Sequence, residues 1–166
     1  MDIVKARSDD DIAAVTVLAW EFIALLRARY PEREAQLQSY LSEQRFEEML
    51  ANFRDHFCPP VGECLLARLE GVPVGIVMMK PAGGGLCEMN RMFVRAAARG
   101  KGIGRGLCEA LIAEARALGY TEMRLGALDR HVEALPLYRS LGFVEDPDPP
   151  AHAVSDSGIF YLRRVL

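Results

Sequence analysis

The sequence predicts an α/β (α+β) fold in which helices flank one central sheet, and three observations carry this prediction. The chain has 166 residues, which fits one domain with a sizeable core, so residues 1–166 are expected to form a single domain. Its composition, 51% hydrophobic and 26% charged, is typical of a globular protein. The spacing of apolar residues changes along the chain between the period of a helix and that of a strand.

The N-terminal third is expected to be mainly helical. Residues 3–7 alternate apolar and polar side chains like a short strand, and Ser8 with the three aspartates after it forms a plausible helix start. Apolar residues at helical spacing predict a helix over 9–29 that ends at Tyr30 and Pro31. The same spacing predicts a second helix over 32–56.

From residue 63 onward the pattern changes to strands separated by glycine turns. The predicted elements are, in order, a hairpin of strands at 64–70 and 74–80, a strand at 86–94, a helix from about 104 to 118 ended by Gly119, a strand at 121–128, a helix at 132–142, and strands at 143–146 and 158–166. A polar, proline-rich loop is expected at 145–158.

Charge and cysteine content exclude several classes of protein. The net charge of −3 argues against nucleic acid or an anionic membrane surface as the main partner. The four cysteines lack the paired spacing of a zinc site and the density of a disulfide scaffold, and no histidine has metal-ligand spacing, so no metal is expected. The sequence shows no signal peptide and no membrane span, which predicts a cytoplasmic protein.

A glycine-rich turn, "RAAARGKGIGRGLCEALIAEA" at 95–115, stands between a strand and a helix. Alternate glycines and the basic Arg99, Lys101 and Arg105 surround a point where unpaired backbone N–H groups and the helix dipole favour a phosphate. The alternative is a surface loop that needs glycine only for its turns. A Walker A loop is excluded because Lys101 precedes Gly102, and a G-x-G-x-x-G fingerprint is not completed.

The hexapeptide "RGKGIG" at 99–104 resembles the acetyl-CoA pyrophosphate loop, R/Q-x-x-G-x-G/A, of the GNAT superfamily of N-acetyltransferases. "LYRSLGF" at 137–143 is similar to the late helix of that family, which packs beside the coenzyme thiol, and the resemblance extends over 63–166. It implies a GNAT fold, with a mixed, mostly antiparallel sheet of six to seven strands flanked by about four helices. It also implies acetyl-CoA as co-substrate.

The resemblance further implies which residues bind the coenzyme. Met92, Phe93 and Val94 would offer backbone groups to the pantetheine arm and the thioester carbonyl, as an oxyanion site. The pyrophosphate would be held by Arg99, Gly100, Lys101, Gly102, Ile103, Gly104 and Arg105. His131 stands where many relatives have a coenzyme-contacting asparagine, and it could donate a hydrogen bond there or simply cap the following helix from solvent.

An amine acceptor would need a base, because an amine with a pKa of about 10.4 is neutral only about one time in 2,500 at pH 7. Some family members use a glutamate at the register of Glu88. Alternation places Glu88 on the same face as Met92 and Val94, unless a bulge intervenes. The alternative is a glutamate that faces solvent or pairs with Arg91 or Arg124.

A second catalytic candidate, Tyr138, lies where the family commonly has a tyrosine that protonates the departing thiolate. The alternative is an aromatic core residue, and the two roles are compatible. The leading hypothesis is therefore direct transfer of the acetyl group of acetyl-CoA, in a ternary complex, to a small-molecule amine or a protein or peptide amine. A non-catalytic acetyl-CoA sensor and transfer of a longer acyl group are the alternatives. Both a monomer and a homodimer are compatible with the sequence.

Overall fold

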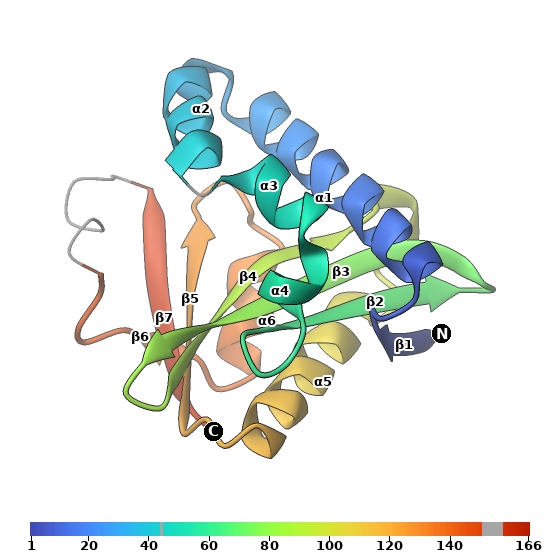
Figure 1. Cartoon of the computed structure of the whole chain (residues 1–166). Coiled ribbons are helices and arrows are strands. Elements are labelled where there is room, and N and C mark those ends of the chain that lie inside the picture. Colours follow the sequence, from blue (N-terminus) through green and yellow to red (C-terminus); the bar gives the residue numbers. More distant parts are fainter. Residues whose placement is uncertain (44, 151–157) are drawn as a thin grey trace.

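The computed structural model describes residues 1–43, 45–150 and 158–166, and it has one seven-stranded sheet with helices on both faces (Figure 1). The strand order is β1-β2-β3-β4-β5-β7-β6. The strands are β1 (Asp2–Lys5), β2 (Glu63–Leu69), β3 (Val72–Gly83), β4 (Leu86–Val94), β5 (Glu122–Leu128), β6 (Val144–Glu145) and β7 (Ile159–Val165). The helices are α1 (Asp9–Arg29), α2 (Glu34–Glu43), α3 (Phe46–Ala51), α4 (Phe53–Phe57), α5 (Ile103–Ala117) and α6 (Ala134–Ser140), with short 3₁₀ turns at Pro31–Arg33 and Ala96–Ala98. The predicted α/β class with a mixed, mostly antiparallel sheet is confirmed.

Helix α1 has the bounds that its sequence predicts. The Ser8 hydroxyl accepts a hydrogen bond from the Asp11 N–H, and the Asp11 carboxylate accepts one from the Ser8 N–H, which forms a capping box. At the other end Pro31 begins a 3₁₀ turn. The buried side chains of α1, among them Leu18 and Ile23, pack on the sheet.

The single helix predicted over 32–56 is wrong. The segment forms a 3₁₀ turn and three shorter helices, α2, α3 and α4, with Arg45 in the left-handed region at φ 48°. Between α3 and α4, the Asn52 backbone N–H and side-chain amide both donate to the Glu48 carbonyl and end the helix there. The break lets Phe46, Phe53 and Phe57 all pack under the N-terminal helices.

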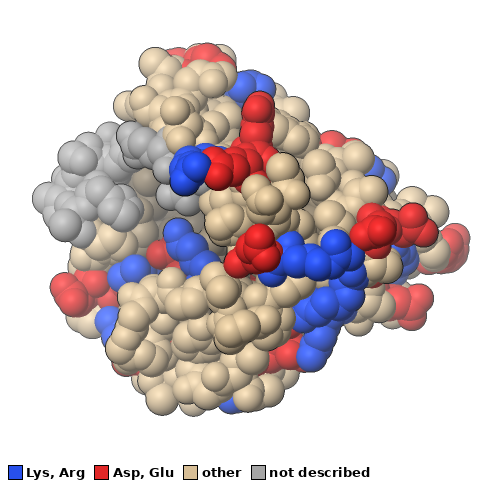
Figure 2. Space-filling model, viewed as in Figure 1, with Lys and Arg blue, Asp and Glu red and all other residues tan. Residues whose placement is uncertain are grey.

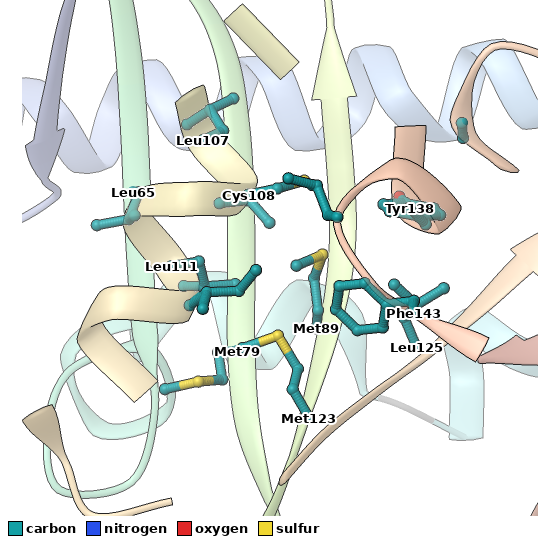
Figure 3. Close-up of a cluster of buried hydrophobic side chains, with 14 of the residues drawn as sticks. Leu65, Met79, Met89, Leu107, Cys108, Leu111, Met123, Leu125, Tyr138 and Phe143 are labelled. Carbon is teal, nitrogen blue, oxygen red and sulfur yellow. The ribbon is translucent and has the colours of Figure 1, made fainter. Parts of the chain in front are cut away.

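The sheet separates two hydrophobic layers. Residues of α5 and α6 pack on one face together with Met79, Met89 and Phe143 (Figure 3). Residues of α1, α3 and α4 pack on the other face. The proline-rich loop predicted at 145–158 lies partly outside the described residues.

Strands β4 and β5 form the one parallel pair of the described sheet, and their pairing is short. It joins Leu86–Met89 to Glu122–Leu125 and then stops, while β5 continues along β7 as far as Leu128. Beyond Met89, β4 pairs only with β3 on its other side. The two central strands therefore diverge, and the backbone of β4 after Met89 has no strand partner on the β5 side.

A β-bulge interrupts β4 in the same region. Met78 pairs with Asn90 and Ile76 with Phe93, so β4 has one residue more than β3 in this interval. Arg91, the non-glycine residue at φ 49°, provides the distortion, in a region that costs a side-chain-bearing residue about 1–2 kcal/mol. The bulge reverses the alternation of side chains that follow it.

The expectation that Glu88 shares a face with Met92 and Val94 is therefore wrong. Glu88 and Asn90 face a cavity beneath α1, whereas Val94 belongs to the core on the α5 side and Met92 packs against it. The expectation was conditional on the absence of a bulge, and β4 contains one.

On the surface, acidic and basic side chains are interspersed. Figure 2 shows a short basic band over α4 and the first strands, bordered by acidic side chains. Among the ion pairs of these elements, Arg54 of α4 lies 2.8 Å from Asp9 of α1, and Lys5 of β1 lies 2.8 Å from Glu114 of α5. None of the described helices is long and apolar enough to cross a membrane.

Candidate active site

Two cavities lie on opposite sides of the divergence between β4 and β5, and the side chain of Phe22 on α1 lines both. We call them the loop cavity, of about 250 Å³, and the helix cavity, of about 330 Å³. The loop cavity is lined by Phe22, Leu25, Met92, Phe93, Val94, Ala98, Arg99, Gly100, Gly102, Ile103, Gly104, Arg105, His131, Glu133, Ala134 and Leu137. All the residues that the resemblance assigns to the coenzyme are in this set except Lys101.

The glycine turn is held on the sheet by two arginines. Arg95 pairs with Glu21 of α1 through two bonds of 2.8 and 2.6 Å, and its N–H donates to the Val74 carbonyl. Arg99 donates from Nε to the Val94 carbonyl at 3.0 Å, which leaves the rest of its guanidinium at the cavity. The loop is thus fixed at both ends of its 3₁₀ turn.

The amino end of α5 forms the floor of the loop cavity. Gly100 and Gly102 have φ values of 76° and 77°, which favour glycine, and Gly102 occupies the N-cap position without any side-chain cap. The first N–H groups of α5 therefore have no intrahelical or capping acceptor. An anion such as a pyrophosphate fits this place, because it accepts those hydrogen bonds and interacts favourably with the helix dipole.

His131 lines the loop cavity, and its ring lies near those of Phe22 on α1 and Tyr30, the residue that follows α1. Its backbone N–H donates to the Leu128 carbonyl, but its ring Nε2 is buried without a hydrogen-bond partner among the described residues. Burial, and then the nearby Arg29 and Arg99, lower the pKa of the imidazole, although Glu133 and Asp129 oppose this. A neutral ring with an unused nitrogen suits an uncharged amide of the coenzyme.

Glu133 joins three segments beside the cavity. Its carboxylate lies 2.7 Å from Arg29 of α1 and 3.6 Å from Arg99 of the glycine turn. Burial raises the pKa of Glu133, but hydrogen bonding to Arg29 and the charge of Arg99 outweigh burial and lower it overall. Arg99 therefore already has an anionic neighbour at the place where a phosphate is expected.

Glu88 lines the helix cavity and is not among the residues of the loop cavity. Its carboxylate lies 3.4 Å from Lys80 of β3 and 3.4 Å from Arg124 of β5. Pairing with Arg124 was the alternative to a catalytic role, and the structure has that pair. The side chain is 22% exposed, so a ligand in the helix cavity can still reach it.

Tyr138 belongs to α6 and its side chain packs in the core, with its ring 6.1 Å from that of Phe143 (Figure 3). It is 7% exposed and is not among the residues lining either cavity, whereas its neighbour Leu137 lines the loop cavity. Burial, with smaller contributions from Cys108 and Glu133, raises the pKa of the phenol, which keeps its proton at neutral pH.

Residues 1–43, 45–150 and 158–166 contain no group of three or more His, Cys, Asp or Glu side chains arranged to hold a metal ion. Buried thiols with a raised pKa remain protonated at neutral pH and are poor nucleophiles. Burial raises the pKa of both Cys87 and Cys108 to about 12.

Sequence reasoning missed several residues of both cavities. Phe22, Leu25 and Glu133 line the loop cavity, but their helical or polar context gives no sign of this. Arg91 was considered only as a partner for Glu88, yet it is 5% exposed and lines the helix cavity. The available signal was the polar pair Asn90 and Arg91, which interrupts the predicted strand at 86–94 just before the apolar "MFV".

This combination of a divergent parallel pair, a bulged central strand and a glycine turn at an uncapped helix defines the class. Residues 20–143 match the acetyltransferase (GNAT) family, and the chain belongs to that family. It is an acyltransferase enzyme of the N-acetyltransferase type.

Relatives of known sequence and structure agree with this assignment. An uncharacterized N-acetyltransferase of Schizosaccharomyces pombe is 40% identical over 116 residues, which are 64% of this chain and 71% of that protein. The human N-acetylaspartate synthetase is 34% identical over 122 residues, 72% of this chain, but this chain spans only 40% of that protein's length. The PaiA N-acetyltransferase of Thermoplasma acidophilum, solved in complex with coenzyme A, is 19% identical and superimposes over the whole of both chains with a TM-score of 0.74.

Proposed function

We propose that this protein transfers the acetyl group of acetyl-CoA to a primary amine by direct attack in a ternary complex. The observation that carries the proposal is the loop cavity, where the uncapped amino end of α5, Arg99 and the unpartnered Nε2 of His131 converge. The first two suit a pyrophosphate and the third suits an amide of the pantetheine arm. The acceptor would enter from the helix cavity, on the other side of the gap between β4 and β5.

In this reaction the amine nitrogen attacks the thioester carbonyl carbon, a C–N bond forms and the C–S bond breaks. The carbonyl oxygen becomes negatively charged in between. Backbone N–H groups of β4 after the bulge have no strand partner on the β5 side, and one of them at Met92 to Val94 would stabilise that charge. Removal of such a donor in other enzymes costs about 2.7–4 kcal/mol.

Glu88 is the proposed base, acting directly or through a water molecule. It lines the helix cavity, where the amine would arrive, and it carries a carboxylate held between Lys80 and Arg124. Those two ion pairs orient the carboxylate. A positioned general base typically contributes about 10²- to 10⁴-fold to the rate, and we expect the low end of that range here.

Tyr138 is the proposed proton donor to the coenzyme thiolate. Its phenol retains its proton at neutral pH, and the preceding residue, Leu137, lines the loop cavity. The side chain also packs in the core, so a purely structural role is the alternative. Replacement of a structural residue lowers stability, whereas replacement of a catalytic residue lowers kcat, and the two quantities can be measured separately.

The test is acetyl-CoA consumption over a broad amine panel, detected by mass, with Glu88→Gln and Tyr138→Phe compared with the wild type. Glu145→Gln, at a carboxylate 75% exposed on β6, and Tyr120→Phe are the matched controls. We expect turnover of one amine class, a fall in kcat of about 100-fold for the two site variants with unchanged acetyl-CoA affinity, and no change for the controls.

Three other outcomes would each contradict a different part of this proposal. Tight acetyl-CoA binding without acetylation of any amine would favour the alternative of an acetyl-CoA sensor. Loss of stability in Tyr138→Phe with unaltered kcat would reduce Tyr138 to a core residue. Absence of acetyl-CoA binding would overturn the proposed role of the loop cavity.

A further inference from the structure

The helix cavity has mainly apolar walls. The rings of Phe22, Tyr30, Tyr40 and Tyr161 line it, and most of the other lining side chains from α1, α2, β5 and β7 are aliphatic. These elements are far apart in the sequence, so the fold assembles the walls. Walls of this composition are typical of a pocket that buries the apolar surface of a small molecule.

The charged groups at the cavity are already engaged within the protein. The carboxylate of Glu88 lies 3.4 Å from Lys80 and 3.4 Å from Arg124. The Arg33 guanidinium also has a partner, and its central carbon lies 5.3 Å from the centre of the Tyr30 ring. These groups therefore leave little charge for a ligand to pair with.

Arg91 does not supply a free charge to the cavity either. Its guanidinium packs on the rings of Phe46 at 4.9 Å and Phe57 at 5.9 Å, and neither ring is among the lining residues. The described part of the cavity thus offers no counter-charge to a second ionic group on a ligand. Burial of such a group without a counter-charge is costly.

A glycine in β5 makes room for one of the aromatic walls. Gly126 pairs with Tyr161 across β5 and β7, and both residues line the cavity. A Cβ at residue 126 would lie 3.3 Å from Cε1 of Tyr161 and 3.5 Å from Cγ2 of Ile159. The φ angle of Gly126 is outside the left-handed region, so the backbone does not require glycine there. The missing side chain instead lets the Tyr161 ring lie against the strand as part of the cavity wall.

The polar groups of the cavity are concentrated on two strands. Most of its polar lining residues belong to β3 and β4, including Lys80 and Glu88, which pair across these strands. Phe22 lines both cavities, and its ring lies 6.2 Å from that of Phe93 in the loop cavity. A ligand can therefore direct an amine toward Glu88 while the rest of its surface contacts the rings.

We propose that the acceptor is a primary amine on an uncharged, apolar body about as large as a phenylethyl group, and that this body fills the helix cavity. This inference rests on the proposed function and narrows it. The aromatic and aliphatic walls favour burial of such a body. A cavity of about 330 Å³ is at the lower end of the range for small-molecule pockets, which suits its size. A polyamine or an amino acid would instead bring a second charge into the cavity without a counter-charge.

The experiment compares amines that differ in apolar length or in one charged group. The series from n-propylamine to n-hexylamine tests length. The diamine 1,5-diaminopentane has the shape of n-hexylamine with a second ammonium group, and L-phenylalanine is 2-phenylethylamine with a carboxylate; rates are expressed per neutral amine. We expect kcat/KM to rise about 4-fold per methylene, and each charged compound to fall about 10-fold or more below its uncharged counterpart.

Two variants test the walls of the cavity. Tyr40→Ala removes a ring that is 38% exposed, and KM for 2-phenylethylamine should rise about 2- to 10-fold. Phe160→Ala is the matched control, because Phe160 is also 38% exposed but is not a lining residue, and it should behave as the wild type. Gly126→Val should displace the Tyr161 ring and raise KM for 2-phenylethylamine more than KM for n-propylamine. Melting temperature and acetyl-CoA affinity, measured for all three, separate loss of acceptor binding from loss of folding.

Preferred acetylation of spermidine, 1,5-diaminopentane or a lysine-bearing peptide would overturn the inference and leave the transferase intact. A kcat/KM that does not rise with chain length, or equal effects of Tyr40→Ala and Phe160→Ala, would overturn it too. If 2-phenylethylamine and n-hexylamine are not acetylated and do not bind the CoA complex by calorimetry, the inference also fails. Failure of the proposed function is distinct, since it appears as absence of acetyl-CoA binding or of transfer to every amine and peptide.

Discussion

The Arg99 guanidinium lies 3.6 Å from the Glu133 carboxylate, and this pair connects the glycine turn to the segment between β5 and α6. The same carboxylate lies 2.7 Å from Arg29 on α1. A phosphate at the amino end of α5 would therefore share Arg99 with a carboxylate of the protein itself. Binding of the coenzyme and the internal ion pair are competing interactions.

Replacement of Glu133 by glutamine should tighten acetyl-CoA binding about 1.5- to 5-fold, because exposed ion pairs contribute about 0.2–1 kcal/mol. The gain should shrink as salt is raised, since screening weakens the competing carboxylate. Calorimetry at two ionic strengths checks both points, with Glu145→Gln as the control. Weaker binding in Glu133→Gln would mean that the carboxylate holds Arg99 in its binding position.

Gly104→Ala should separate stability from coenzyme affinity. Alanine is about 1 kcal/mol more favourable than glycine within a helix, so α5 should become more stable. The added Cβ would lie 3.4 Å from Leu137 and 3.6 Å from Met92, two residues that line the loop cavity. The expected result is a higher melting temperature together with a higher KM for acetyl-CoA.

Gly106→Ala provides the opposite control on the same helix. Its Cβ would meet Ile3 at 3.0 Å and Met1 at 3.2 Å, on the side of β1, away from the loop cavity. Stability should fall or stay level while KM is unchanged. Equal KM values for the two variants would remove Gly104 from the coenzyme site.

Asp11 should stabilise the fold in a pH-dependent way. Hydrogen bonds from Ser8, and then the bond from Arg68 at 2.9 Å, lower the pKa of Asp11 to about 2, against about 3.9 in an unfolded chain. A lowered pKa in the folded state gives stability that is complete above about pH 4 and is lost as the pH falls toward 2. Asp11→Asn should therefore lose about 1–2 kcal/mol at pH 7.

The difference between Asp11→Asn and the wild type should narrow below pH 4. Urea unfolding at pH 7, 5 and 3 measures it. The exposed neighbour Asp10 serves as the control, because its carboxylate has no hydrogen bond in the described structure, and Asp10→Asn should change stability little. A gap that stays constant down to pH 3 would contradict the role of the Asp11 charge.

Elements with explicit local signals could be predicted from the sequence. The Ser8 cap and Pro31 define both ends of α1, and Gly119, at φ 86°, follows the end of α5 as expected. The helix break at Arg45 has no such signal, because neither glycine nor proline precedes it and the left-handed conformation falls on an arginine. Packing of the phenylalanines under the N-terminal helices determines that break.

The candidate site also has one part that local sequence signals predict and another part that they do not. The glycine turn is a local motif, and the structure brings its residues together at one cavity. The face of Glu88 depended on counting alternate positions through Arg91, where a bulge on a non-glycine residue is invisible to periodicity. The ion pairs of Glu88 with Lys80 and Arg124 are contacts between strands, and no local pattern encodes them.

The bulge at Arg91 has a consequence for how such a protein can diversify. The half of β4 before it presents Glu88 and Asn90 to the helix cavity, while the half after it turns Met92 and Val94 toward the core beside α5. Substitutions in the first half can therefore alter one cavity without disturbing the other. Because β4 has one additional residue, the residues that face one side of the sheet can be substituted independently of those that face the other side.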